Sequence, residues 1–203
     1  MWESFLSSLL DFIAPPRQTQ MLVRTLSLQE LQKHMLRGEQ AGMLPYHDER
    51  VRALVWELKY YANKTAARLG AEVLHEVLIA IATEQLGKPL LIPVPMHKAR
   101  ERERGHNQTE VLCEALMPFI HGYVDYAPHI LTRTKNTSQQ QGLEKHVRLT
   151  NVASSMAAGP DVLGRVCIVL DDVSTTGATF AEATRALKAA GARHVECIAL
   201  AQS

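Results

Sequence analysis

The chain alternates two hydrophobic patterns, one with the period of a helix and one of short uninterrupted apolar runs. The helical stretches are 2–13, 48–59 and 63–85, and the apolar runs are 90–94, 166–170 and 195–200. A helical period predicts a helix with one buried face, and a short apolar run between turns predicts a buried strand. Their alternation predicts an α/β fold with a mostly parallel central sheet flanked by helices.

Helix-capping residues and glycines add further boundaries. Two stretches with the spacing of a capping box, 27–30 and 107–110, predict helices that run to about residues 37 and 117. A helix over about 176–190 is followed by Gly191, a typical residue just beyond a helix end. A short strand is expected at 130–132.

Residues 1–44 differ in texture from the rest, because they contain helical patterns and no apolar strand run. We therefore expect a helical N-terminal segment over 1–44 and one α/β domain over 45–203. A chain of 203 residues is long enough for one such domain with an appendage.

Composition is that of a globular protein, with 46% hydrophobic and 21% charged residues. This excludes intrinsic disorder, collagen and coiled coil. Lys and Arg number 22 against 21 Asp and Glu, a net charge of +1. A protein that binds nucleic acid over its whole surface would be far more basic, although local basic patches remain open.

Cys113, Cys167 and Cys197 are the only cysteines, and no two are close in sequence. They offer neither a redox pair nor a zinc-finger spacing, so we expect buried free thiols and no zinc. The N-terminal apolar stretch has Glu3 where a signal peptide is basic, and Asp11 interrupts it. We therefore expect a cytoplasmic protein without a membrane segment.

The strongest chemical signal is CIVLDDVSTTGAT at 167–179. An apolar strand runs into Asp171 and Asp172, and a loop of small hydroxyl residues with Gly177 leads into a helix. Ligands of open α/β sheets bind at the carboxyl ends of strands, and helix N-termini bind anions. The plain alternative is a buried strand followed by an ordinary acidic turn.

A ligand with vicinal hydroxyls at one end and a phosphate at the other fits both parts of this segment. The carboxylates would accept hydrogen bonds from the hydroxyls, and the loop would hold the phosphate. Ribose 5-phosphate has that layout. Other phosphate motifs are absent, because Gly87-Lys88 is followed by Pro89 and no G-x-G-x-x-G occurs.

Residues 167–179 resemble the signature for phosphoribosyl pyrophosphate (PRPP) of type I phosphoribosyltransferases. The resemblance implies that Asp171 and Asp172 bind the ribose hydroxyls and that a following loop binds the 5′-phosphate. The expected phosphate-binding residues are Val173, Ser174, Thr175, Thr176, Gly177, Ala178 and Thr179.

Residues 45–203 as a whole resemble the ComF family of competence-associated phosphoribosyltransferases. Three further blocks carry this resemblance: LVWELKY at 54–60, IPVPMHKARERERGHNQ at 92–108, and the spaced residues Arg133, Thr137, Gln140, Leu143, Arg148 and Asn151. His106 stands where the family usually has Phe, which alters a packing contact in that loop. Residues 1–44 contain no cysteine and so lack the four-cysteine zinc ribbon that often begins these proteins.

The segment after the strand at 90–94 stands where type I enzymes place their pyrophosphate loop. The expected pyrophosphate-binding residues are Val94, Pro95, Met96, His97, Lys98 and Arg104. Residues 97–106 carry a net charge of +2 from four Lys and Arg against two Glu. The alternative is a solvated helix face with pairs such as Arg100–Glu103.

The polar stretch 134–142 predicts a loop where type I enzymes close a lid over PRPP. Candidate contacts are Arg133, Lys135, Gln139 and Gln140. Closure would exclude water from the reacting sugar. The alternative is a surface linker.

The implied reaction is displacement of pyrophosphate at ribose C1 by a nitrogenous acceptor. Asp171, Asp172, Arg133 and Lys135 are the expected catalytic residues, and Mg²⁺ is the expected cofactor, held directly or indirectly by the two aspartates. Purine enzymes for 6-oxopurines usually carry an acid where this chain has Thr175, so the acceptor stays undefined.

The family resemblance also implies a link to DNA uptake or nucleotide salvage. Partners would be PRPP, the acceptor and DNA-uptake or DNA-processing proteins, and a homo-oligomer is open. The alternative function is a non-catalytic protein that senses PRPP or nucleotides.

Overall fold

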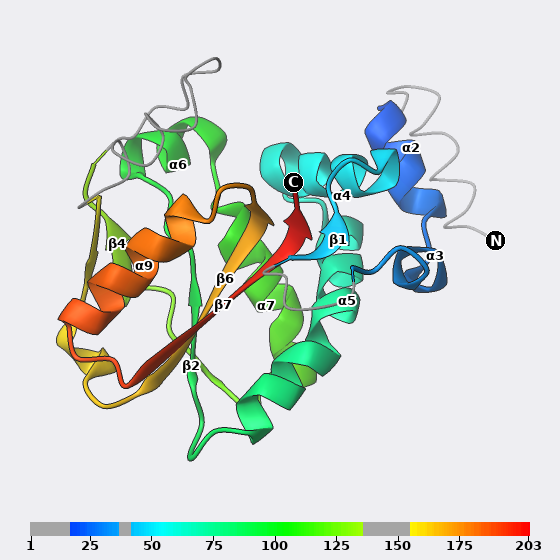
Figure 1. Ribbon diagram of the computed structural model, residues 1–203. Helices are drawn as coiled ribbons and strands as arrows, with labels where there is room; N and C mark the ends of the chain where they lie inside the picture. Colours follow the sequence, from blue (N-terminus) through cyan, green and yellow to red (C-terminus); the bar gives the residue numbers. More distant parts are fainter. Residues whose placement is uncertain (1–16, 37–41, 136–154) are drawn as a thin grey trace.

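The computed structural model describes residues 17–36, 42–135 and 155–203. Its centre is a five-stranded, all-parallel sheet of order β1-β7-β6-β2-β3 (Figure 1). The strands are β1 Gly42–Pro45, β2 Leu90–Pro93, β3 Asp125–Tyr126, β6 Val166–Ser174 and β7 His194–Gln202. The predicted α/β fold with a mostly parallel sheet is confirmed.

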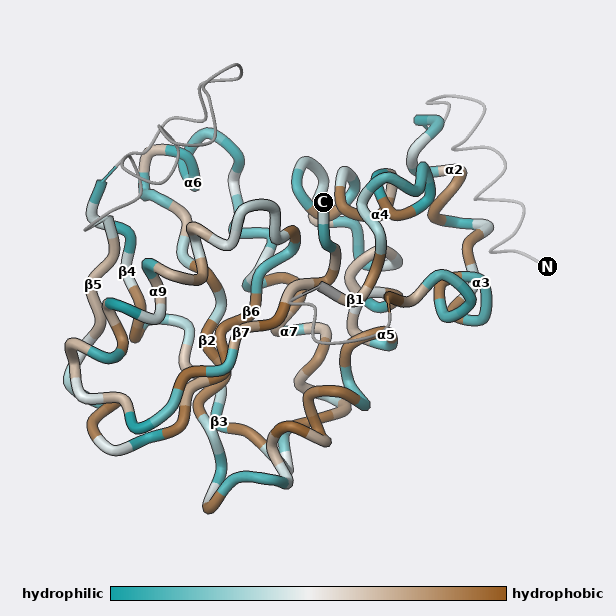
Figure 2. The backbone as a smooth tube through the Cα atoms, viewed as in Figure 1, coloured by the Kyte–Doolittle hydropathy of each residue, from teal (hydrophilic) through white to brown (hydrophobic). Residues whose placement is uncertain are grey.

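Helices and a small second sheet cover the two faces of this sheet. One face packs against α4 (Glu49–Tyr61), α5 (Lys64–Thr83) and α7 (Gln108–Ile120), and the other packs against α9 (Ala178–Ala189) and the antiparallel pair β4 (Leu131–Arg133) and β5 (Met156–Ala158). Alternation along β6 produces this sandwich. Ile168 and Leu170 join the first core, whereas Cys167 and Val169 join the second. The central strands are the most hydrophobic part of the sheet (Figure 2).

The N-terminal segment contributes α2 (Gln18–Thr25), α3 (Leu28–Gln32) and the edge strand β1. The capping box at Ser27 and Glu30 is confirmed. The Glu30 backbone N–H donates to the Ser27 hydroxyl, and the Ser27 backbone N–H donates to the Glu30 carboxylate. Neither α2 nor β1 was predicted. Val23 of α2 and Leu31 of α3 are fully buried in the same core as α4 and α5. The predicted helix over 2–13 lies outside the described residues.

Several predicted elements have different bounds in the structure. Strand β6 continues through Asp171 and Asp172 to Ser174. The two acids therefore lie inside the strand, near its carboxyl end, and not in the loop after it. The short strand predicted near 130 pairs with β5 instead of joining the central sheet. Residues Lys98–Arg104, read as part of a loop, form helix α6. The Asn107 side chain caps α7 by accepting from the backbone N–H of Thr109, whereas the predicted capping box would bond the backbone N–H of Glu110.

Cys113 and Cys167 are buried free thiols as predicted, and Cys197 is a half-buried one. In the described part of the chain, no helix is both long and apolar enough to cross a membrane.

Candidate functional site

Two adjacent buried carboxylates form the centre of the candidate site. Asp171 and Asp172 are 7% and 4% exposed and lie near the carboxyl end of β6. Neighbouring strands run in the same direction, so the segments after β2 and β7 lie at this same end of the sheet. This is the edge at which open α/β sheets bind their ligands.

The two carboxylates have different surroundings. The Asp172 backbone N–H donates to Asp171 Oδ1 at 2.8 Å. Burial and then the neighbouring Asp172 charge raise the pKa of Asp171 well above its usual range. The Lys59 ammonium instead pairs with Asp172 Oδ2 at 3.0 Å, and Gln108 Nε2 lies 3.5 Å from Asp172 Oδ1. The site thus contains Asp172, which is paired with Lys59, beside Asp171, whose charged form is disfavoured by burial.

Lys59 reaches the site from the last turns of α4. Burial is the largest single influence and acts to lower the pKa of Lys59, but the charge and the hydrogen bond of Asp172, with smaller contributions from Tyr46 and Asp171, together outweigh it, and the pKa of Lys59 is raised. The ammonium is therefore held in its charged form against the carboxylate. Sequence reasoning did not include Lys59 or Gln108 among the site residues. Both lie within segments of family resemblance, LVWELKY and RGHNQ, which were the available signal.

The predicted phosphate loop joins β6 to α9 and surrounds a small hollow of about 30 Å³. The lining residues include Asp171 and the whole run from Val173 to Phe180. Gly177 precedes the first turn of α9 with φ +73°, a left-handed conformation that favours glycine. The Thr176 hydroxyl accepts weakly from the Ala178 backbone N–H at 3.4 Å. The loop therefore offers hydroxyls and a helix N-terminus next to the carboxylates.

The predicted pyrophosphate segment continues β2 alongside β6. The Val94 N–H donates to the Leu170 carbonyl at 2.8 Å, and Val94 is buried. His97 caps α6 by accepting from the Ala99 N–H at 3.2 Å. Pro95 is buried, Met96 is half-buried, and Lys98 is exposed at the start of α6. The structure thus brings this segment beside the strand that carries the aspartates.

Arg104 approaches the site through a side-chain relay. Its Nη1 donates to Gln108 Oε1 at 2.9 Å, and Gln108 in turn faces Asp172. Its guanidinium also lies over the Tyr60 ring, 5.1 Å from the centroid. Arg104 is therefore near the aspartates without contacting them directly.

Arg133 ends β4 and faces the site from the side of α9. Burial lowers the pKa of Arg133, the charges of Asp171 and Glu182 act to raise it, and Arg100 acts to lower it. The charge of Asp171 is thus the main influence that opposes burial at Arg133. Lys135 is exposed two residues later. The predicted contacts Gln139 and Gln140 lie outside the described residues.

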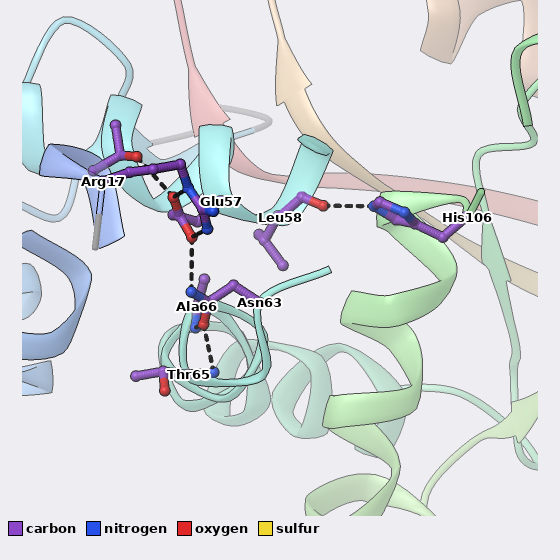
Figure 3. Close-up of polar contacts among 8 residues, drawn as sticks. Arg17, Glu57, Leu58, Asn63, Thr65, Ala66 and His106 are labelled. Carbon is purple, nitrogen blue, oxygen red and sulfur yellow. Dashed lines mark hydrogen bonds and ion pairs between the residues drawn. The ribbon is translucent and has the colours of Figure 1, made fainter. Parts of the chain in front are cut away.

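A buried carboxylate fixes the end of α4 that carries Lys59 (Figure 3). Glu57 is fully buried and accepts from Arg17 at 3.3 and 3.1 Å, from Thr19 at 2.7 Å and from Asn63 at 2.8 Å. Asn63 also caps α5 through the Thr65 N–H. Glu57 thereby links the N-terminal segment to the helix that reaches the site.

The next residue of α4, Leu58, contacts the turn between α6 and α7 on the other side of the site. The Leu58 carbonyl lies 2.9 Å from His106 Nε2, in the turn between α6 and α7 (Figure 3). The histidine that replaces the usual phenylalanine of the family motif thus makes a polar contact to α4. Glu57, Leu58 and Lys59 in succession bind the N-terminal segment, the α6–α7 turn and Asp172.

Comparison with known proteins agrees with the geometry. The phosphoribosyl transferase domain family matches residues 118–203. The chain is 34% identical over 145 residues to the DNA utilization protein YhgH of Escherichia coli, covering 70% of this chain and 63% of that protein. It is 30% identical over 149 residues to Competence protein F of Haemophilus influenzae, covering 71% and 63%. The matches therefore span less than two thirds of these relatives.

Among solved structures, a hypoxanthine phosphoribosyltransferase from Staphylococcus aureus aligns with 66% of this chain and 72% of its own, at a TM-score of 0.41 and 9% identity. The α/β fold follows from the order and the parallel direction of the five strands. The matched domain and the two sequence relatives thus agree with the resemblance of this chain to the competence-associated ComF family of phosphoribosyltransferases.

Proposed function

We propose that the protein binds PRPP and transfers its ribose 5-phosphate to a nitrogenous acceptor, releasing pyrophosphate. One observation carries the proposal: two buried carboxylates at the end of β6 continue directly into a loop that surrounds a hollow at a helix N-terminus. The vicinal hydroxyls and the phosphate of ribose 5-phosphate would match these two parts in order.

Each group would have one task in the reaction. Asp171 and Asp172 would accept hydrogen bonds from the ribose hydroxyls and orient the sugar. The backbone after β2, with Lys98 and Arg104, would hold the pyrophosphate. Arg133 and Lys135 would offset charge that builds on the leaving group as the bond to C1 breaks. Positioning and charge neutralisation, with little acid–base chemistry, would supply most of the rate.

Mg²⁺ would bind in this site together with the substrate. Within the described ranges, no group of three or more His, Cys, Asp or Glu is placed to hold a metal. Asp171 and Asp172 fit a role in which they contact a hydrated ion that the pyrophosphate brings, since Mg²⁺ commonly combines few carboxylates with phosphates and waters. The ion would neutralise charge on the leaving group. We propose no zinc, which elemental analysis of the purified protein would test.

A role in competence or DNA use is the biological setting that we propose, because the two sequence relatives are a DNA utilization protein and a competence protein. The alternative remains a protein that binds PRPP or nucleotides without turnover. The polar stretch 134–142, flanked by Arg133 and including Lys135, favours catalysis, because a sensor need not exclude water from its ligand.

The decisive test is calorimetry with Mg²⁺-PRPP on the double variant Asp171→Asn, Asp172→Asn. We expect binding to be lost, while the control Asp161→Asn, an exposed acid remote from β6's end, binds like the wild type. Unchanged affinity in the double variant would overturn the proposal. PRPP consumption with a panel of bases would then separate the enzyme from the sensor.

A further inference from the structure

Helix α4 presents a pair of exposed aromatic rings on the face that also carries Lys59. Trp56 and Tyr60 are 47% and 46% exposed, and their ring centroids lie 4.3 Å apart. Residues three and four apart share one helix face, so Trp56, Lys59 and Tyr60 lie together. Large exposed aromatic surface beside a charged site is typical of a binding surface.

Two routes connect this ring pair to Asp172. Along α4, Lys59 follows Trp56 by three residues and its ammonium pairs with Asp172 at 3.0 Å. From α6, Arg104 lies over the Tyr60 ring and bonds Gln108, whose amide faces Asp172. The i, i+4 spacing of Trp56 and Tyr60 on one helix would explain why their rings stack. It would not explain why two cations, Lys59 and Arg104, link this ring pair to the surroundings of the buried Asp172.

The chemistry of ribose indicates what would lie there. The C1 and C5 substituents of the sugar project from opposite ends of the ring, with the vicinal hydroxyls between. If the 5′-phosphate occupies the hollow on the α9 side and the hydroxyls face Asp171 and Asp172, C1 lies on the other side of the carboxylates. That is the side from which Lys59 and Gln108 contact Asp172.

We propose that Trp56 and Tyr60 form the binding site for the planar nitrogenous ring of the acceptor, while Arg104 keeps its role toward the pyrophosphate. Stacking on aromatic rings binds any heteroaromatic base with little selectivity. This fits a site where the chain has Thr175 in place of an acid that would select a 6-oxopurine. The inference rests on the proposed function, because it assumes that the ribose lies on the aspartates.

The anchoring of α4 supports a rigid platform. Glu57 and Leu58, between the two rings in sequence, are held by the N-terminal segment and by His106 (Figure 3). The rings therefore project from a helix whose position relative to Asp172 is fixed on both sides, which is what selective placement of a base requires.

Calorimetry would compare a nucleoside 5′-monophosphate with ribose 5-phosphate, so that the affinity ratio isolates the base. We expect Tyr60→Leu and Trp56→Leu each to lower nucleotide affinity by about 5- to 150-fold, the range of one stacking contact. Ribose 5-phosphate affinity should stay unchanged. Tyr60→Phe, which keeps the ring, should behave like wild type, as should the control Tyr123→Leu, an exposed tyrosine just before β3.

Tryptophan emission gives a second readout. The chain has two tryptophans, so Trp2→Phe leaves Trp56 as the single reporter. Nucleotide should quench its emission, and ribose 5-phosphate should not.

Three results would overturn the inference while leaving the proposed function standing. They are an unchanged affinity ratio in both ring variants, an equal loss for ribose 5-phosphate, or a dependence on the rings only for a single-stranded oligonucleotide. Absence of any ribose 5-phosphate binding in the wild type would instead overturn the proposed function, and this inference with it.

Discussion

Gly177 illustrates how one backbone angle supports a binding loop. Its φ of +73° is costly for residues with a Cβ, yet a Cβ built there would meet no atom of the described residues within 4 Å. The space beside it is therefore available to a ligand. Gly164 is a matched control, since it has φ +69° and equally open surroundings at a different place in the chain.

We expect Gly177→Ala and Gly164→Ala to lower the free energy of unfolding by a similar amount, about 1–2 kcal/mol, because both force a Cβ into left-handed backbone. Only Gly177→Ala should also weaken ribose 5-phosphate, by about 10-fold or more, through the loss of one charge-assisted hydrogen bond. Denaturant unfolding and calorimetry on both variants check this. Equal ligand affinity in the two variants would place the phosphate elsewhere.

Lys59 and Asp172 form an ion pair whose carboxylate is almost fully buried and whose ammonium is about one quarter exposed. Lys59→Met should lower the free energy of unfolding by about 2 kcal/mol, below the range for fully buried pairs because Lys59 is partly solvated. The double variant with Asp172→Asn should recover part of that loss, since no buried charge is then left alone. A urea double-mutant cycle measures the coupling. Strict additivity would show that the pair contributes nothing.

At the residue scale, the sequence was sufficient for groups that lie in one continuous segment. Asp171, Asp172 and the loop to Thr179 could be identified because strand, carboxylates and helix start follow one another directly. Lys59 could not, because its contact with Asp172 depends on how α4 lies across the end of the sheet. Only its place in a family motif gave any indication.

At the element scale, long helices and central strands were predictable because their periods or apolar runs are unambiguous. Strands β1, β3 and β5 have two to four residues and no readable period, so they form only because a neighbouring strand offers hydrogen-bond partners. The same reason explains why Gly42–Pro45, assigned to a helical segment, is the edge strand beside β7.

Glu57 of α4 connects that helix to the N-terminal segment and to the start of α5, and this connection can be tested by mutation. Burial acts to raise its pKa, but hydrogen bonds from Arg17, Thr19 and Asn63 outweigh burial, and the pKa of Glu57 is lowered. A folded-state pKa below the unfolded one, about 4.3, adds stability that is present above that value and is lost as pH falls through the folded pKa.

Glu57→Gln should therefore lower the free energy of unfolding by about 2–3 kcal/mol near pH 7, because the buried carboxylate loses its ion pair with the partly exposed Arg17 and the charge that strengthens its hydrogen bonds. The gap between wild type and variant should narrow below about pH 4, where Glu57 itself becomes protonated. Urea unfolding from pH 3 to 7 measures the gap, with the exposed Glu103→Gln as control. A gap of constant size across that range would show that the charge of Glu57 is irrelevant.

At the scale of the whole molecule, the N-terminal helices and the sheet share one apolar core. Val23 of α2 and Leu31 of α3 are buried with Leu54 and Leu58 of α4. Met21, two residues before Val23 on the opposite side of the same helix, is 47% exposed. A segment that packs in this way should unfold with the domain and not before it, because its apolar contacts are also contacts of the domain.

Val23→Ala should accordingly lower the stability of the entire protein by about 2 kcal/mol, the transfer and cavity cost of the deleted methyl groups. Met21→Ala, a change on the same helix at an exposed position, should cost less than about 0.5 kcal/mol. Circular dichroism should report one transition for each protein, shifted to lower temperature only in Val23→Ala. Trp56 emission, recorded in the Trp2→Phe background, reports on α4 and should shift with it. If Val23→Ala instead gave an early minor transition and left the Trp56 transition unmoved, the N-terminal helices would be a separate unit, and their contact with Glu57 could not position the site.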